Sequence, residues 1–344
     1  MRFIVKLLLT MLLLTPATLW GTAAIWLRLP MTGAGRGAVA ALFVATMMTA
    51  IVSLWKQNVY VSLAIVVVVW AVLLGWWATI LPSNNRNWQP DVAHVARGQI
   101  NGDVLTVENV RNFNWRTDSD FDARWETRQY RLSQLQGADL FLSYWAGESV
   151  AHAIMSFNFE GSDPLAFSIE IRKEKGENYS ALTGFFKTYE LAVLAADERD
   201  VVKVRSTVRG EDVRIFRLDM RPETAMGLLR EYVVLANDVS ENPRWYNTLS
   251  ANCTTMIFGM ARRLDPRTRL DWRILLPGQL PSYLREHEFV SREVPLDGLI
   301  AASRIGRRAA GPLPDTRFST RIRNGVPYPA GAARSGADAN TAPR

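Results

Sequence analysis

The 344-residue chain contains one cysteine, Cys253, which follows Asn252. Asn is a favoured N-cap, and Met256, Ile257 and Met260 recur at helical spacing after it. The pattern predicts that Cys253 lies in the first turn of a helix, beside the positive end of the helix dipole, which favours a thiolate. The alternative is a buried structural thiol that packs as a small hydrophobe.

A nucleophilic thiol needs a base, and His152 is the best candidate. The segment from Val150 to Phe159 alternates as a strand, with His152 on its more polar face together with Ser156 and Asn158. His94 lies near the start of the domain and His287 stands between two glutamates. A lone strand histidine is also commonly a hydrogen-bonded structural residue, so this role for His152 remains a hypothesis.

Thiol-dependent acyl transfer also needs donors for the developing oxyanion. Backbone N–H groups of the first helical turn can supply them, with Asn252 and Thr254 as supporting residues. Glu170 is a candidate to orient His152, although it can equally pair with Arg172 or Arg205. The spacing of the three histidines predicts no metal site, and no cofactor is expected. We interpret residues 197–200, of sequence DERD, as a charged turn between strands.

Charge divides the chain into three parts. Residues 1–90 hold six basic residues and no acid, residues 91–303 hold 26 basic and 31 acidic residues, and residues 304–344 hold eight Arg and two Asp. The net charges are therefore +6, −5 and +6. A folded domain that binds nucleic acid would concentrate positive charge, so nucleic acid is not an expected partner.

Residues 1–81 contain three uncharged apolar runs, between Lys6 and Arg28, between Arg36 and Lys56, and between Lys56 and Arg86. Each is long enough to span a bilayer. Aromatic residues lie near the ends of the runs, as interfacial anchors do: Trp20, Trp26, Trp55, Tyr60, Trp76, Trp77 and Trp88. The alternative for the first run is a cleaved signal peptide.

The charges that flank the runs favour neither orientation strongly, but Arg2 and Lys6 before the first run favour a cytoplasmic N-terminus. Three spans then place the following domain across the membrane, outside the cytoplasm. Residues 82–90 read as a polar tether and residues 91–303 as one domain. Residues 304–344 are expected to be a disordered basic tail, whose arginines can attract anionic lipid near a bilayer.

The domain alternates strands with a few helices and predicts an α+β fold with an antiparallel sheet. Strands are expected at Gly102 to Val107, Ala138 to Trp145, Val150 to Phe159, Leu165 to Arg172, Tyr189 to Ala195, Val201 to Val208, Asp212 to Leu218 and Glu288 to Val294. Helices are expected from Pro222 to about Asn237, at Cys253 and from Ser282 to Glu286.

Five segments in order carry a resemblance to a known family: residues 109–113, 150–159, 168–172, 197–200 and 251–255. Over residues 90–303 the chain resembles the Lnb-type periplasmic domain family. The resemblance implies a papain-like domain in permuted order, with the His strand before the Cys helix. It also implies an acyl-chain transfer within bacterial lipoproteins that produces a lyso form.

These observations together predict a membrane-anchored thiol acyltransferase or hydrolase that acts on a lipid-linked or lipoprotein substrate through Cys253 and His152. Membrane lipid and an envelope substrate are the expected partners. The first alternative keeps the two residues but makes the protein a cell-envelope amidase or peptidase. The second is a catalytically inert, membrane-tethered binding module.

Overall fold

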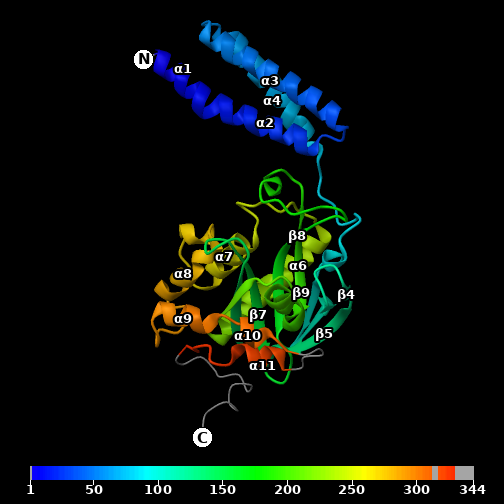
Figure 1. Cartoon of the computed structure of the whole chain (residues 1–344), viewed down its shortest axis with the longest axis vertical. Coiled ribbons are helices and arrows are strands. Elements are labelled where there is room, and N and C mark those ends of the chain that lie inside the picture. The colour runs from blue at the N-terminus through cyan, green and yellow to red at the C-terminus, as the bar shows by residue number, and fades with distance from the viewer. Residues whose placement is uncertain (1, 312–316, 330–344) are drawn as a thin grey trace. The chain divides into compact units, whose positions relative to one another are not determined.

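The computed structural model describes residues 2–311 and 317–329 (Figure 1). The chain forms two compact units. The first contains the N-terminal helices up to Ser83 together with two later segments, Tyr179–Tyr189 and Trp245–Asn247. The second, from Asn84 onward, contains the rest of the chain. Residues 84–90 pack within the second unit rather than forming a free tether, since Trp88 is buried and lies under the Arg172 guanidinium.

The first unit is built on three long apolar helices (Figure 1). They cover Phe3–Arg28, Gly33–Trp55 and Val59–Thr79, with mean hydropathies of 1.8, 2.1 and 2.5. The first consists of α1 (Arg2–Leu9), a π-helical turn η1 (Thr10–Leu14) and α2 (Thr15–Arg28), and the others are α3 (Gly33–Trp55) and α4 (Val59–Thr79). The expected three membrane-spanning helices are therefore confirmed by length and apolar composition.

The second unit is organised around one sheet with the strand order β1-β2-β9-β8-β7-β6-β10, and β5 also pairs with β2. The strands are β1 (Arg97–Asn101), β2 (Val104–Arg111), β5 (Trp125–Arg131), β6 (Leu135–Tyr144), β7 (Ala151–Phe159), β8 (Leu165–Arg172), β9 (Glu190–Asp197) and β10 (Asp212–Arg217). A small hairpin pairs β3 (Asn114–Trp115) with β4 (Phe121–Asp122). The predicted α+β class is confirmed, but the sheet is mixed, because β2 and β9 run parallel.

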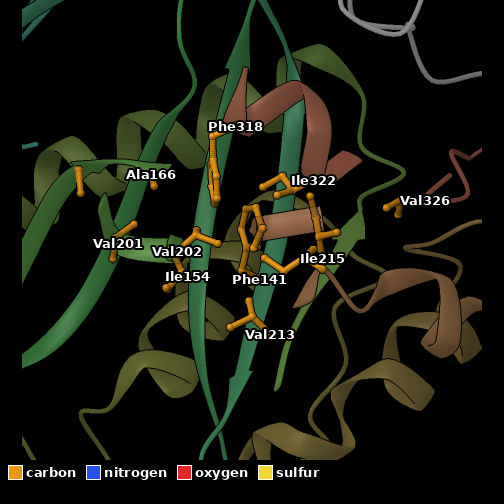
Figure 2. Packing of buried hydrophobic residues seen from close by; sticks show 13 residues of the cluster. Phe141, Ile154, Ala166, Val201, Val202, Val213, Ile215, Phe318, Ile322 and Val326 are labelled. Atoms are coloured by element: carbon orange, nitrogen blue, oxygen red, sulfur yellow. The ribbon is translucent and has the colours of Figure 1, made fainter. Parts of the chain in front are cut away.

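Helices cover both faces of this sheet. On one face, Tyr232 of α6 (Pro222–Glu241) packs against Phe157 and Phe167, and α7 (Cys253–Leu264) contacts β7 and β8. On the other face, Phe141 and Ile154 belong to a buried cluster with side chains from α5 (Glu198–Lys203) and α11 (Phe318–Arg323) (Figure 2). The remaining helices are α8 (Leu280–Glu286), α9 (Leu296–Ser303) and α10 (Gly306–Ala309). Alternating side chains of β7 thus face two separate cores.

The expectation of a disordered tail does not hold for residues 304–311 and 317–329. Phe318 and Ile322 of α11 are fully buried and lie near Phe141 in Figure 2. Arg323 is also buried, and its guanidinium donates to Asp139 over 2.8 Å and to Glu198 over 2.7 Å. Composition misleads here because the carboxylates that neutralise Arg323 lie far away in the sequence. Residues 312–316 and 330–344 lie outside the described part of the chain.

Two predicted strands and one predicted turn are also wrong. Residues 198–203 form α5 and residues 204–208 form a π-helical turn, η5 (Val204–Val208), where a strand was expected. The acidic segment before them is the start of this helix, with Asp197 as N-cap and with Glu198 and Asp200 buried. No strand forms at residues 288–294, where backbone carbonyls of Ser291 and Val294 accept from the Arg285 side chain instead. Tertiary contacts override the β-branched composition in both places.

Candidate functional site

Helix α7 begins at Cys253, as expected, and a reciprocal capping box fixes its start. Asn252 Oδ1 accepts from the Thr255 N–H over 2.9 Å, while Thr255 Oγ1 accepts from the Asn252 N–H over 3.1 Å. Asn252 Nδ2 donates to the Thr248 carbonyl over 2.7 Å. The Asn252 side chain is thus committed to the cap. Within the described chain, the N–H groups of Cys253 and Thr254 have no hydrogen-bond acceptor, and they remain as donors at the helix N-terminus.

The pairing between strands β7 and β8 ends before the N-terminal part of β7, where His152 lies. Strand β7 pairs with β6 as far as Ala151, but its pairing with β8 stops at Ile154 opposite Ser168. The Ala153 N–H lies just beyond this last pair and is one of the groups that lower the pKa of the Cys253 thiol.

His152 belongs to a polar network that is largely shielded from solvent. Its Nε2 lies 2.8 Å from Ser168 Oγ and 3.1 Å from Glu170 Oε1. Ser168 Oγ donates to the same Glu170 oxygen over 2.6 Å, and Arg205 Nη2 donates to it over 2.7 Å. Arg205 Nη1 also lies 3.6 Å from Glu211. This network holds the imidazole ring through Nε2.

Of the two arginines that the sequence offered to Glu170, the structure pairs it with Arg205. The Arg172 guanidinium instead donates to the backbone carbonyls of Val92 and Ala93. Ser168 and Glu211 had no role in the sequence-based hypothesis, and Arg205 entered it only as a possible partner of Glu170. A partial signal was available for Ser168, because it stands two residues before Glu170 and so shares its face of the strand.

The electrostatics of the site favour an ion pair. Burial raises the pKa of the Cys253 thiol, but the positive charge of His152 and hydrogen bonds from His152, the Ala153 N–H and Thr254 lower it to a net value of about 7. Burial lowers the pKa of His152, but Glu170 and the Cys253 thiolate raise it to about 9. Between these two values the stable form is a thiolate beside an imidazolium. Thr254 Oγ1 lies 3.7 Å from Sγ.

Tyr232 of α6 is a further polar group near the thiol that sequence reasoning treated only as part of an apolar helix face. Its side chain is fully buried, and its ring lies 5.1 Å from Phe167 and 5.8 Å from Phe157. Its hydroxyl has no hydrogen-bond partner among the described residues. Burial, together with the negative charge of the Cys253 thiolate, raises the Tyr232 pKa well above its usual value. An unpaired hydroxyl in a closed core is costly.

A cavity of about 810 Å³ lies at the other end of β7 and is lined by polar residues that include Asn158, Arg128 and Arg323. Neither it nor the second described cavity is lined by Cys253 or His152. The guanidinium groups of Arg128 and Arg323 are paired with carboxylates. Cys253 itself is only 7% exposed. The described residues hold no group of three or more His, Cys, Asp or Glu side chains arranged to bind a metal ion.

The molecule is thus a protein with three apolar helices and an α+β domain, in which the one cysteine begins a helix and His152 lies in a polar network with Ser168 and Glu170. Residues 121–278 match the family model described as the Lnb N-terminal periplasmic domain. The matched segment contains Cys253, His152, Ser168 and Glu170, so the resemblance that the sequence motifs indicated is confirmed over these residues. Comparisons with curated proteins and with solved structures gave no match.

Proposed function

We propose that the protein is a membrane-anchored cysteine acyltransferase or hydrolase that acts on a lipid-linked or lipoprotein substrate. Cys253 is the nucleophile, His152 is the general base and acid, and Glu170 with Ser168 orients the imidazole. The observation that carries the proposal is the position of Cys253 at a helix N-terminus, where His152 and the Ala153 N–H lower the pKa of its thiol. Burial alone raises a thiol pKa, whereas here the neighbouring groups lower it to about 7.

The chemistry proceeds through a thioester. The Cys253 thiolate attacks the carbonyl carbon of an ester, and the tetrahedral oxyanion receives hydrogen bonds from the free N–H groups of the first turn of α7. Protonated His152 gives its proton to the departing alkoxide as the ester C–O bond breaks. Neutral His152 then takes a proton from water or from an acceptor amine or hydroxyl, which attacks the thioester and releases the thiolate. Water makes the reaction a hydrolysis, and another nucleophile makes it a transfer.

The anchor favours a substrate that is itself held in the membrane. In the proposed arrangement the N-terminus lies in the cytoplasm of a bacterial cell, and the three helices cross the inner membrane. The domain then lies in the periplasm, which agrees with the description of the matching family model. Fusions at Asn101 test this arrangement: alkaline phosphatase, which is active only outside the cytoplasm, should be active, and green fluorescent protein exported in the same way should be dark. The opposite pattern would reverse the orientation.

The chemical proposal is tested by trapping the intermediate. Purified protein in detergent is mixed with a diacylated lipoprotein, a phospholipid or a muropeptide, quenched with acid, and digested for mass spectrometry. An acyl mass on the Cys253 peptide that hydroxylamine removes is the expected result with an acyl-ester substrate, and it should be absent in His152→Ala. Acylation by a muropeptide fragment alone would favour the amidase or peptidase. Unmodified Cys253 with every substrate, together with measurable binding, would favour the inert binding module.

A further inference from the structure

Two short segments within the residues that match the family model do not belong to the second unit. Tyr179–Tyr189, between β8 and β9, and Trp245–Asn247, between α6 and α7, belong to the compact unit that contains the apolar helices. We use the name interfacial segment for Tyr179–Tyr189. Both segments therefore pack with the apolar helices, although the chain on either side of each belongs to the second unit.

Lys187 attaches the interfacial segment to the end of helix α4. Its Nζ donates to the backbone carbonyl of Trp77 over 2.8 Å and to that of Ile80 over 3.2 Å, and it lies 5.1 Å from the ring centroid of Trp77. The last carbonyls of a helix have no partner within the helix, and an ammonium group satisfies both their hydrogen bonds and the helix dipole. The neighbouring Phe186 ring stacks 6.0 Å from Trp20 of α2.

The shorter segment, Trp245–Asn247, contacts the C-terminal ends of α2 and α4. Trp245 Nε1 donates to the Ile80 carbonyl over 3.4 Å, and its ring lies 5.4 Å from the Arg28 guanidinium. Arg28 is the last residue of α2, and Ile80 directly follows α4. Tryptophan and long basic side chains are typical of the boundary between the hydrocarbon core and water. The interfacial segment and Trp245 therefore both contact the first unit near the C-terminal ends of its apolar helices.

The interfacial segment exposes apolar side chains at this level. Leu182 is 65% exposed, Tyr179 41% and Phe185 39%, and Leu81, just beyond α4, is 70% exposed. Within Tyr179–Tyr189 the only charged residue is Lys187, which is held by the carbonyls of α4. A loop in water gains nothing from presenting this combination, whereas a loop in the headgroup region buries it among acyl chains.

We propose that the interfacial segment is a lipid-binding surface, in which Leu182 and Phe185 insert into the outer edge of the hydrocarbon core of the bilayer. The occupant is the lipid leaflet, because the surface continues the apolar surface of the spans within one compact unit. This proposal goes beyond the proposed catalytic function and does not depend on it.

The test uses the full chain in lipid nanodiscs. Cys253→Ser removes the only cysteine, so Leu182→Cys or Phe185→Cys in that background carries a single environment-sensitive bimane label. Leu270→Cys is the matched control, because Leu270 is 76% exposed in the second unit. With lipids brominated near the headgroup end of their acyl chains, we expect quenching at positions 182 and 185 to exceed that at position 270 at least threefold.

Equal quenching at positions 182, 185 and 270 would overturn the proposal, whether all three are quenched or none is. Thermal melts of the labelled variants check that the label has not unfolded the unit. A second measurement needs no label in the segment: Leu182→Asp should lower retention of the chain on vesicles after mild protease nicking of the spans, and Leu270→Asp should not. Retention unchanged by Leu182→Asp also contradicts lipid insertion. Neither measurement uses turnover, so failure of the catalytic proposal would leave these results interpretable.

Discussion

Oε1 of Glu170 lies 3.1 Å from Nε2 of His152. The negative charge of the Glu170 carboxylate, close to Nε2, therefore stabilises the protonated form of the His152 imidazole. Burial works in the opposite direction, and the His152 pKa is nevertheless raised to about 9, with Glu170 as the leading cause of the increase. The pair is thus an electrostatic support for the proposed acid and base, and it can be tested separately from the nucleophile.

Glu170→Gln should move the alkaline limb of the pH profile. Loss of the carboxylate lowers the His152 pKa below about 9, so the imidazolium loses its proton at lower pH and kcat/KM falls earlier as pH rises. A displacement of about one pH unit corresponds to about 1.4 kcal/mol. Glu160→Gln is the control, because Glu160 is exposed. An alkaline limb that stays in place would show that Glu170 does not act on His152.

Alkylation of Cys253 should report its ionisation directly. The thiol loses its proton as pH rises through about 7, so the rate with iodoacetamide should rise around that pH and then level off. In His152→Ala the neighbouring cation is absent while burial remains, so the inflection should move to higher pH. Glutathione in the same buffers gives the unperturbed thiol. An inflection for the wild-type protein at or above that of glutathione would refute the lowered pKa.

Cys253→Ala and His152→Ala should each abolish turnover, and the double variant should be little worse than either single one. Members of one catalytic unit are strongly non-additive, because loss of either stops the same step. Melting temperatures should change far less than activity. Full activity in Cys253→Ala would end the proposed mechanism. A structural cysteine would give the reverse result, with stability lost and activity retained.

Tyr232→Phe should leave the protein as stable as before or slightly more stable. The hydroxyl is fully buried without a partner in the described structure, so its removal relieves a desolvation cost of about 1–3 kcal/mol and preserves the ring contacts with Phe157 and Phe167. Thermal melts measure this, and Tyr283→Phe, whose hydroxyl donates to the Arg269 carbonyl, is the destabilised control. A clear fall in melting temperature for Tyr232→Phe would mean that its hydroxyl is satisfied.

Arg323→Met should destabilise the domain by about 3–5 kcal/mol, because it leaves buried Glu198 and Asp139 short of a positive charge. For a domain of this size the melting temperature should fall by about 10 °C. Arg307→Met, on an exposed residue of α10, should have little effect. A disordered tail would make the two substitutions equivalent.

The local signals of the sequence were sufficient where neighbours in the chain decide the structure. The apolar runs predicted three helices, Asn252 predicted the cap of α7, and alternation placed His152 on a strand. They failed where distant partners decide: Val201 and Val202 pack into the cluster of Phe141 within a helix, and Arg323 is buried by Asp139 and Glu198. No pattern of spacing could reveal that Ser168 would lie between His152 and Glu170, because that contact depends on how two strands come into register.

The two returns of the chain to the helical unit have a practical meaning for handling the protein. A domain that is joined to its membrane anchor by a single linker is released by one proteolytic cleavage. It can also be expressed alone from a start after that linker. Here a chain that begins at Asn84 would still carry Phe186, Lys187 and Trp245, but it would lack the ends of α2 and α4 against which they pack. Such a fragment would expose to solvent the loops that have lost these packing partners, and their apolar side chains would favour aggregation. Detergent or lipid therefore belongs in every preparation, even one that dispenses with the membrane-spanning helices.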